Sequence, residues 1–417
     1  MSLKRFSDNK LFVQLTVFLI SFLLVFSRRP DAVLNPQFWA EDGKFWYAEA
    51  YNSGIFSSLL TPNAGYFQTI SRLVAIAAQF IPFLYAPMLF NLVAITIKIL
   101  FVNVLISSRC VELIPNKIVR FTIAFIYLAL PNSYEVHANL TNAQWHLALL
   151  ACLIILAKPG GRLAWRIFDI AVITLSVLSG PFCLFLLPVV FVQWRRTKNL
   201  WTRNLFYIVL AGALIQICSL IFLSPRPSNA ELGATIELFF KIIGGQIFLA
   251  SLIGQSIYAH VGYGGWWTIS FAVAVTIAGC LPVAYAVWKG KPELKLYLLF
   301  AGLITLGALL SPAVVQEKPQ WQELWLPYRG NRYWLIPMFG FILSLIFTAA
   351  QTSNRYLRTF AALFLLTLPI GIYEDWSFEP YKDMRFPEQA RKLADAPTGS
   401  EVEIPINPNW TMTLVKK

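Results

Sequence analysis

The chain has 417 residues, of which 57% are hydrophobic and only 13% are charged, and its formal net charge is +13. Soluble domains carry roughly a quarter charged residues, so this composition excludes a water-soluble globular protein and indicates a chain folded in lipid. The basic excess does not indicate a nucleic-acid partner, because most basic residues lie in short loops between hydrophobic segments, where they set membrane orientation.

Apolar segments of bilayer-crossing length, about 17–25 residues each, recur along the chain and predict one polytopic bundle. They lack the ten-residue alternation of a membrane β-barrel, so the expected fold class is all-α. The first span is expected to remain uncleaved, because Arg28 and Arg29 follow it rather than small residues. We expect eleven spans, at 11–27, 85–108, 118–130, 144–157, 167–179, 181–194, 203–223, 266–288, 294–311, 333–350 and 359–373.

Other segments are predicted to lie outside the bilayer core. Two apolar stretches are interrupted by polar residues and read as helices lying along the membrane surface. The segments concerned are the surface helices 68–83 and 234–258, the loops 28–70 and 312–332, and the tail 374–417. We therefore expect a membrane domain, 1–373, followed by a short polar C-terminal tail, 374–417.

The positions of lysine and arginine predict the orientation. Basic residues favour cytoplasmic loops, and the chain begins with Lys4, Arg5 and Lys10. With a cytoplasmic N-terminus, the other short basic loops also fall inside, and the long polar segments and the C-terminus fall outside. We therefore expect an integral membrane protein with its polar loops on the outer face, which is the periplasm if this is the inner membrane of a Gram-negative bacterium.

Two adjacent acids, Glu41 and Asp42, stand where the chain first leaves the membrane, in the aromatic run 38–47. A carboxylate within about 3 Å of a hydroxyl can accept its proton, as sugar transfer from a phosphate leaving group requires. The plain alternative is that the pair solvates a loop or caps a helix. An acid held among aromatics at lipid depth is costly unless it is used or paired, so Glu41 and Asp42 are the candidate catalytic residues.

Three arginines near the predicted outer face are candidates for binding a phosphate. Arginine engages phosphate through a planar fork that lysine lacks. Arg332 and Arg329 precede the tenth span, and Arg72 lies on the first surface helix. Arg332 is the foremost of the three; the alternative for each is a membrane-interface anchor or a snorkelling side chain.

The outer loop 132–146 is unusually polar for a short connection between spans. Its side chains offer the hydrogen-bonding groups that a sugar needs, and its tryptophan offers a stacking face. The candidate substrate-binding residues here are His137, Asn139, Gln144, Trp145 and His146. The spacing of His137, His146 and Glu135 matches no metal-binding pattern, so we expect no metal or other cofactor.

The order of these motifs resembles the C-type glycosyltransferases (GT-C fold), integral membrane enzymes that use polyprenyl-phosphate sugars. The motifs of this chain are similar in particular to those of bacterial enzymes that decorate O-antigen or other surface polysaccharides, such as the serotype-converting glucosyltransferases. The resemblance covers about 1–373. Its motifs are Trp39-Ala40-Glu41-Asp42-Gly43, Gly65-Tyr66 with Arg72, Leu178-Ser179-Gly180-Pro181-Phe182, and Asn331-Arg332-Tyr333-Trp334.

The resemblance implies a role for each motif. Glu41 or Asp42 is the base; many relatives place Asp first, so which acid acts stays open. Arg332 binds the donor phosphate, and Tyr66 and Tyr333 join the substrate-binding set. The implied reaction is an inverting transfer of a hexose such as glucose from polyprenyl phosphate to a surface glycan or lipid-linked acceptor. Some members of the wider class need a divalent metal, but the chain lacks an Asp-x-Asp motif.

Three other classes remain alternatives. A transporter or flippase of lipid-linked sugars predicts internal repeats with matching broken helices, and the sequence has none. A polysaccharide polymerase or ligase favours a large late outer loop, whereas 312–332 is short. A non-catalytic membrane scaffold is the third.

Overall fold

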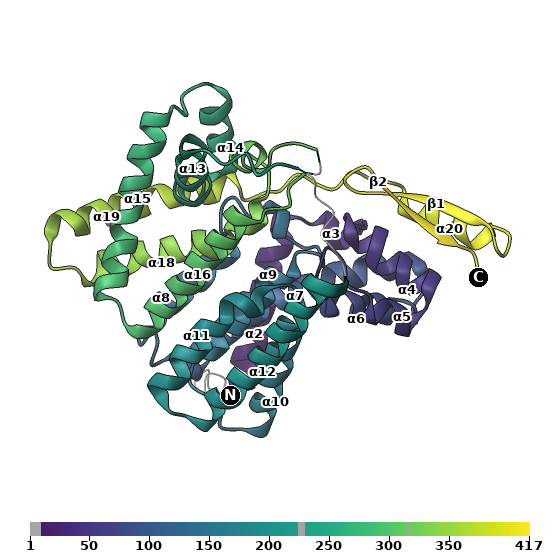
Figure 1. Ribbon diagram of the computed structural model, residues 1–417, viewed down its shortest axis with the longest axis horizontal. Coiled ribbons are helices and arrows are strands. Elements are labelled where there is room, and N and C mark those ends of the chain that lie inside the picture. Colours follow the sequence, from purple (N-terminus) through teal and green to yellow (C-terminus); the bar gives the residue numbers. More distant parts are fainter. Residues whose placement is uncertain (1–9, 224–229, 316) are drawn as a thin grey trace, which may run out of the picture.

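The computed structural model describes residues 10–223, 230–315 and 317–417; Lys4 and Arg5, on which the predicted orientation draws, lie outside this part. Figure 1 shows a bundle of helices with a small appendage, coloured yellow, at one side. Eight of the helices described are long and apolar enough to cross a membrane. These features indicate a mostly helical, polytopic integral membrane protein.

The long apolar helices form the body of the bundle. They are α2 (Lys10–Arg28), α7 (Ala86–Ile106), α12 (Leu200–Cys218), α15 (Ile269–Lys289), α16 (Pro292–Leu310), α18 (Leu335–Gln351) and α19 (Arg355–Glu374). Helices of intermediate length are α6 (Thr69–Ala78), α8 (Lys117–Leu128), α9 (Ala143–Leu156), α10 (Leu163–Val177), α11 (Phe182–Thr197) and the composite of α13 (Ile236–Ile242), η6 (Ile243–Leu249) and α14 (Ala250–Tyr263).

Short elements join these helices. They are α3 (Asp31–Leu34), η1 (Asp42–Tyr47), α4 (Ala48–Ser53), α5 (Ile55–Leu60), η2 (Phe83–Tyr85), η3 (Ser108–Cys110), η4 (Tyr134–Val136), η5 (Ser219–Leu223), α17 (Gln320–Leu324) and η7 (Asn331–Trp334). The C-terminal elements are α20 (Phe386–Asp395), β1 (Glu401–Ile406) and β2 (Trp410–Val415).

Seven of the eleven expected spans coincide with helices that are long enough to cross. The four others correspond to α8, α9, α10 and α11, which have 12, 14, 15 and 16 residues. At about 1.5 Å per residue these helices fall short of a hydrocarbon core about 30 Å thick. The number eleven is therefore not confirmed by helix length.

The eighth long segment, Ile236–Tyr263, covers the stretch that the sequence predicts to lie along the membrane surface. Its backbone breaks at Gly254, which has a φ of 85°. Gln246 Nε2 donates to the carbonyls of Leu324 at 3.0 Å and Leu326 at 2.9 Å, and the Tyr258 hydroxyl donates to the Trp325 carbonyl at 2.7 Å. These bonds tie successive parts of the segment to one loop, but its length and apolar composition also suit a crossing, so the surface placement is not confirmed.

The connecting loops gather at two ends of the bundle, as the sequence predicts. At one end, Asp42 bonds the backbone of Leu140 and Arg332 pairs with Glu135. At the other end, the basic loops meet one another: Arg109 pairs with Asp169, and three further contacts join them. These are Lys158–Glu112, Arg196–Glu293 and the Lys291 ammonium on the Glu112 carbonyl.

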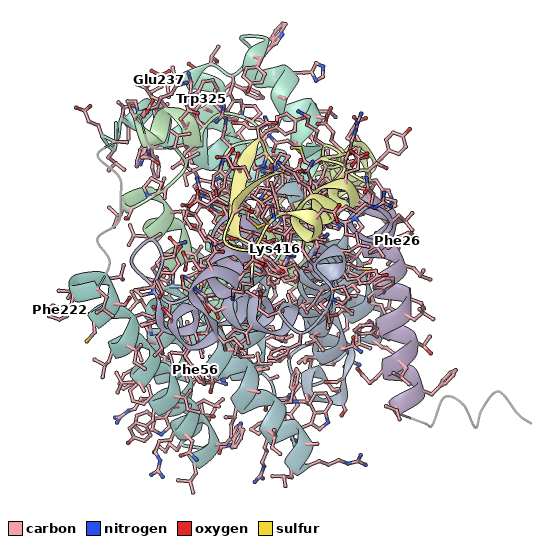
Figure 2. All side chains as sticks on the ribbon, turned by 90° about the vertical axis from the view of Figure 1, so that its right-hand side faces the viewer. Phe26, Phe56, Phe222, Glu237, Trp325 and Lys416 are labelled. Carbon is pink, nitrogen blue, oxygen red and sulfur yellow. The ribbon has the colours of Figure 1, made fainter. Side chains whose placement is uncertain are left out.

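The polar tail contains a β-hairpin that the all-α prediction misses. β1 and β2 pair antiparallel, and β1 alternates exposed and buried residues because Val402, Ile404 and Ile406 point inward. The hairpin lies beside α4, where Asn52 Nδ2 donates to the Thr413 carbonyl at 2.9 Å. In Figure 2, which views the molecule from the right-hand side of Figure 1, the hairpin and α20 (yellow) face the viewer. The period-two alternation in residues 401–406 was the available sequence signal.

The buried ion pair between Arg109 and Asp169 predicts a stability test. Both guanidinium nitrogens lie 2.7 Å from the carboxylate oxygens, and both side chains are buried. Arg109→Ala leaves a buried carboxylate without its partner, so we expect a loss of about 3–5 kcal/mol in unfolding free energy. Thermal unfolding of the purified chain in detergent measures it.

The matched control is the exposed pair of Lys158 with Glu112 at the same end of the bundle. Glu112→Ala is expected to leave the unfolding midpoint unchanged, because solvent screens such pairs. Equal losses in the two variants would contradict the assignment of stability to the buried pair.

Candidate functional site

The acid pair follows a sharp turn at the start of the first outer segment. Ala40 has a φ of 44°, and its N–H donates to the Asn407 carbonyl of the tail at 2.6 Å. Asp42 is 1% exposed, and its Oδ2 accepts a hydrogen bond from the Leu140 N–H at 3.0 Å. Its other oxygen, Oδ1, has no bonding partner among the residues described. The turn thus aims Asp42 into the protein.

The two acids differ in environment. Burial raises the pKa of the Asp42 carboxyl well above its usual range; the Leu140 N–H opposes this rise and the neighbouring Glu41 charge adds to it. Glu41 is partly exposed, and its Oε2 accepts from the Thr141 hydroxyl at 3.3 Å. Asp42 is therefore biased toward the protonated form, and Glu41 is the acid that a ligand can reach.

Arg72 belongs to the same cluster through Trp46. The Trp46 indole donates to the Thr141 hydroxyl at 3.4 Å, and the Arg72 guanidinium lies 4.7 Å from the centre of the Trp46 ring. Arg72 is 1% exposed, pairs with Glu49 and donates to the Thr61 carbonyl at 2.9 Å. Its guanidinium is thus engaged mainly with protein groups.

Arg332 is bound to the same polar loop through Glu135. It pairs with Glu135, and its backbone N–H also donates to Glu135 Oε2 at 3.0 Å. One guanidinium nitrogen donates to the Ala313 carbonyl at 2.5 Å. Arg332 lies within the electrostatic reach of Glu41, and its side chain is 26% exposed. A partly accessible guanidinium is therefore held on the loop whose Thr141 also contacts Glu41.

Arg329, three residues earlier in the chain, is placed differently. Its side chain is 49% exposed and lies 3.5 Å from Glu323, which also faces Lys318 at 3.5 Å. Contacts of this length leave the guanidinium loosely held. No contact between Arg329 and the acid pair is recorded among the described residues.

Gln144, Trp145 and Tyr333 converge next to the acids. Gln144 Nε2 donates to the Thr141 carbonyl at 3.1 Å, and the Trp145 ring meets the Tyr333 ring edge-on at 5.5 Å. Gln144 Oε1 and the Trp145 indole N–H are buried without a bonding partner in the described chain. A Cβ at Gly180 would lie 2.2 Å from Gln144 Oε1, so glycine leaves the room that this side chain needs.

The histidines are occupied by protein contacts. His137 Nε2 lies 3.0 Å from the Val25 carbonyl, and its Nδ1 lies 3.4 Å from the Lys98 ammonium. His146 contacts the Tyr127 hydroxyl at 2.8 Å and the Val136 carbonyl at 2.9 Å. Burial, followed by the charge of Lys98, lowers the pKa of His137 well below its usual range. These rings hold the loop in place.

Asn139 and Tyr66 also have defined places. Asn139 Nδ2 donates to the Glu135 carbonyl at 2.7 Å, and its Oδ1 accepts from the Asn142 N–H at 3.1 Å. Tyr66 is partly exposed in a tight turn, where its backbone pairs with that of Asn63. Asn139 therefore braces the loop, and Tyr66 stands at the edge of the cluster.

Two residues of the site were not singled out for these roles in the sequence. Thr141 contacts Glu41 and Trp46, and Glu135 holds Arg332. Both lie in the polar loop 132–146, whose composition was the only signal. Their partners are about 100 and 197 positions away in the chain, a separation that no local pattern encodes.

Within the part of the chain that the structure covers, no three His, Cys, Asp or Glu side chains are grouped so that they could hold a metal ion. The site therefore consists of carboxylates, guanidinium groups, amides and aromatic rings. Such a set can accept a proton, bind an oxyanion and stack on a sugar ring.

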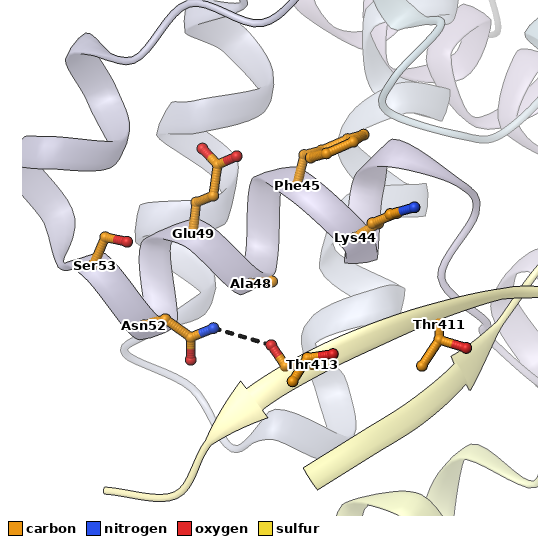
Figure 3. Close-up of a pocket in the computed structure, with 8 residues that line it drawn as sticks. All are labelled: Lys44, Phe45, Ala48, Glu49, Asn52, Ser53, Thr411 and Thr413. Atoms are coloured by element: carbon orange, nitrogen blue, oxygen red, sulfur yellow. Dashed lines mark hydrogen bonds between the residues drawn. The ribbon is translucent and has the colours of Figure 1, made fainter. Parts of the chain in front are cut away.

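An open groove of about 230 Å³ lies beside this cluster, between α4 and β2. Figure 3 shows Glu49 and Asn52 on α4 and Thr411 and Thr413 on the strand, with a hydrogen bond from Asn52 across to Thr413. Glu49 connects the groove to Arg72. The groove has a mixed lining, because Phe45 and Ala48 stand beside its polar side chains.

A scan against protein-family models finds none that matches the chain, and a search of curated proteins finds no match either. The site is therefore defined by its geometry: a buried acid, a reachable acid, an accessible arginine and unpartnered polar atoms around them.

The raised pKa of Asp42 predicts a pH dependence of stability. The folded chain holds this proton more tightly than the unfolded chain does, so the resulting stabilisation is complete below the ordinary value of 3.8. It is lost as pH rises from there through the folded-state pKa. We expect Asp42→Asn to remove this loss, so that its unfolding midpoint, relative to wild type, increases with pH.

Thermal unfolding in detergent, followed from about pH 4 to pH 8, measures the difference. Glu41→Gln is the neighbouring control and is expected to leave most of the Asp42 contribution in place, because burial is the larger cause of the raised pKa. A parallel pH profile for wild type and Asp42→Asn would contradict the buried, proton-holding state of Asp42.

Proposed function

We propose that this chain is a GT-C-type membrane glycosyltransferase that transfers a sugar from a polyprenyl-phosphate donor to a glycan or lipid-linked acceptor. One observation carries the proposal. The loop 135–141 contacts three groups distant in sequence: Glu41 through Thr141, Asp42 through Leu140, and Arg332 through Glu135. A base and a phosphate-binding cation are thereby held around one point.

In the proposed reaction, Glu41 is the base. An acceptor hydroxyl gives its proton to the Glu41 carboxylate while its oxygen bonds to the anomeric carbon of the donor sugar. The bond from that carbon to the phosphate oxygen breaks, and polyprenyl phosphate leaves with the electron pair. Direct displacement inverts the anomeric centre. Glu41 is preferred to Asp42 because its carboxylate is partly exposed.

Arg332 stabilises the negative charge that develops on the leaving phosphate. Glu135 orients the guanidinium, and the exposed part of the side chain faces the phosphate. Arg329, loosely held and half exposed, supplies a second contact. Arg72 contributes by holding the Trp46 ring in place. The side chains of Gln144 and Trp145 line the sugar. Asp42 positions Leu140 and Thr141, and Thr141 in turn contacts Glu41.

The proposed setting is the bacterial inner membrane, with the site at its periplasmic face and a cytoplasmic N-terminus. The lipid tail of the donor lies in the bilayer, and its phosphate reaches Arg332 at the end of the bundle. In this arrangement α8, α9, α10 and α11 count as crossings despite their length. The expected sugar is a hexose such as glucose, and the expected acceptor is a surface glycan.

A transporter or flippase of lipid-linked sugars is the alternative class. Lys98 on α7 is buried beside His137, and charges inside a bundle often mark transport paths. Transport leaves the bond between sugar and phosphate intact, whereas transfer releases free polyprenyl phosphate. An assay of polyprenyl phosphate release therefore distinguishes a transporter from a glycosyltransferase. Measuring the size of the glycan product in the same assay distinguishes transfer of a single sugar from the products of a polymerase or ligase.

The first test measures release of polyprenyl phosphate from polyprenyl-phosphate glucose by the purified chain, with extracted surface glycan as acceptor. We expect Glu41→Gln to reduce release about 10²–10⁴-fold, because it removes the proton acceptor. Asp42→Asn is expected to reduce it less, since an amide oxygen still accepts from the Leu140 N–H. Arg332→Gln is expected to reduce release through loss of phosphate stabilisation.

His260→Gln, an exposed substitution on α14, serves as the neutral control and is expected to match wild type. Equal activity in wild type and Glu41→Gln would remove Glu41 as the base. Donor sugars other than glucose are tried in the same assay, and binding without release from any of them would favour the transporter.

A further inference from the structure

A second cavity, of about 490 Å³, is lined in part by Trp39, two residues before Glu41. Its walls come from the end of α2, the loop 132–134, the break in α14 and the segment 374–382, which we call the strap. Its volume falls within the range of about 300–1,000 Å³ typical of ligand sites. None of the roles proposed above uses it.

Aromatic rings line much of the cavity. Trp39 and Tyr381 are stacked, with ring centres 4.8 Å apart, and Tyr134 and Tyr328 meet edge-on, with ring centres 6.0 Å apart. Phe378 of the strap completes this set. Rings of this kind offer apolar faces edged by polar groups, which suits the C–H faces of a sugar ring.

The remaining lining groups are suited to hydroxyls. Arg29 and Gln255 are each 3% exposed, yet Arg29 Nε and Gln255 Nε2 have no bonding partner in the described residues. Unpartnered buried donors are costly and fit a ligand that supplies oxygen acceptors. Glu374 and Glu379 are exposed and can accept from ligand hydroxyls. The other polar lining residues are Asn132, Ser133, Ser256, Asp375, Ser377, Lys382 and Asn407.

The strap is held in place by hydrogen bonds at several points, so this wall of the cavity has a defined structure. The Phe378 N–H donates to the Arg28 carbonyl at 2.8 Å, and the Tyr381 N–H donates to Asp31 Oδ2 at 3.0 Å. Asn407 Nδ2 donates to the Lys382 carbonyl at 2.9 Å. The C-terminal tail thereby closes the cavity over the membrane domain.

We propose that this cavity binds a saccharide unit of the acceptor glycan. The cavity adjoins the chemistry, because Trp39 is two residues from Glu41 and the loop 132–134 continues into the residues that hold both acids. Its identity as an acceptor site rests on the proposed function; saccharide binding itself does not. The open groove beside α4 is the competing location, but its one acid, Glu49, already pairs with Arg72.

Direct binding tests the proposal. The full chain in nanodiscs is titrated with size-fractionated oligosaccharides, released by mild acid from the surface glycan of the native host cells, and binding is followed by saturation-transfer NMR. Ser256→Trp and Ser377→Trp each place an indole in the cavity. The matched control, Ser53→Trp, places the same indole in the open groove.

We expect wild type and Ser53→Trp to bind alike. Each cavity variant is expected to bind at least about tenfold more weakly, equivalent to about 1.4 kcal/mol. Unfolding midpoints equal to that of wild type establish that the cavity variants fold. Two variants are used so that the test remains valid if one of them does not fold. The cavity variants should also lose transfer to glycan while retaining slow release of polyprenyl phosphate to water.

The outcomes separate the two proposals. Saccharide binding that is lost in the cavity variants, with no transfer by wild type from any donor, supports the site and removes the transferase. Transfer by wild type that persists in both cavity variants removes the site and leaves the transferase. Absence of saccharide binding by wild type, or binding lost only in Ser53→Trp, overturns the cavity assignment.

Discussion

The rest of the structure depends on how the buried loop 132–142 satisfies its polar groups. Almost all of this loop is buried, yet only one short turn of helix lies within it. Buried backbone groups must find partners, and here side chains from distant segments provide them. Arg29 donates to the His137 carbonyl, Asp42 accepts from Leu140, and Asp375 accepts from the Asn132 N–H at 2.7 Å. The loop thereby joins α2, the first outer segment and the end of α19.

The candidate site lies where some buried polar side-chain atoms have no hydrogen-bond partner among the described residues. Asp42 uses one oxygen on the loop and leaves the other without a partner, and Gln144 and Trp145 each leave a buried polar atom unpaired. A buried polar atom without a partner destabilises the fold, whereas the neighbouring histidines are fully engaged. Within one polar loop, this difference separates side chains that support the structure from those that remain available to a ligand.

The sequence predicts the helical membrane class and the grouping of loops at two ends, because these follow from local hydropathy and charge. Its surface placement of 234–258 is not confirmed, since Ile236–Tyr263 is long and apolar enough to cross. Its count of eleven spans is not confirmed, because α8 to α11 are shorter than the apolar runs suggest and apolar runs do not report where a helix ends. The only sequence signal for the hairpin in the tail is the alternation of polar and apolar residues over 401–406. The polar composition of the tail makes this short signal easy to miss. The acid pair and Arg332 were identified by type and position. Thr141 and Glu135 were not, because their importance comes from partners about 100 or more positions away.

The pair of Glu135 with Arg332 links the two proposed ligand sites. Glu135 follows Tyr134, which lines the cavity, and Arg332 is the proposed donor-phosphate ligand. A phosphate arriving at Arg332 competes with Glu135 for the same guanidinium. Weakening that ion pair changes the restraint on Tyr134, and so on the cavity wall. Under the proposed function, donor and acceptor therefore act on one another through this loop, and by linkage the effect is reciprocal.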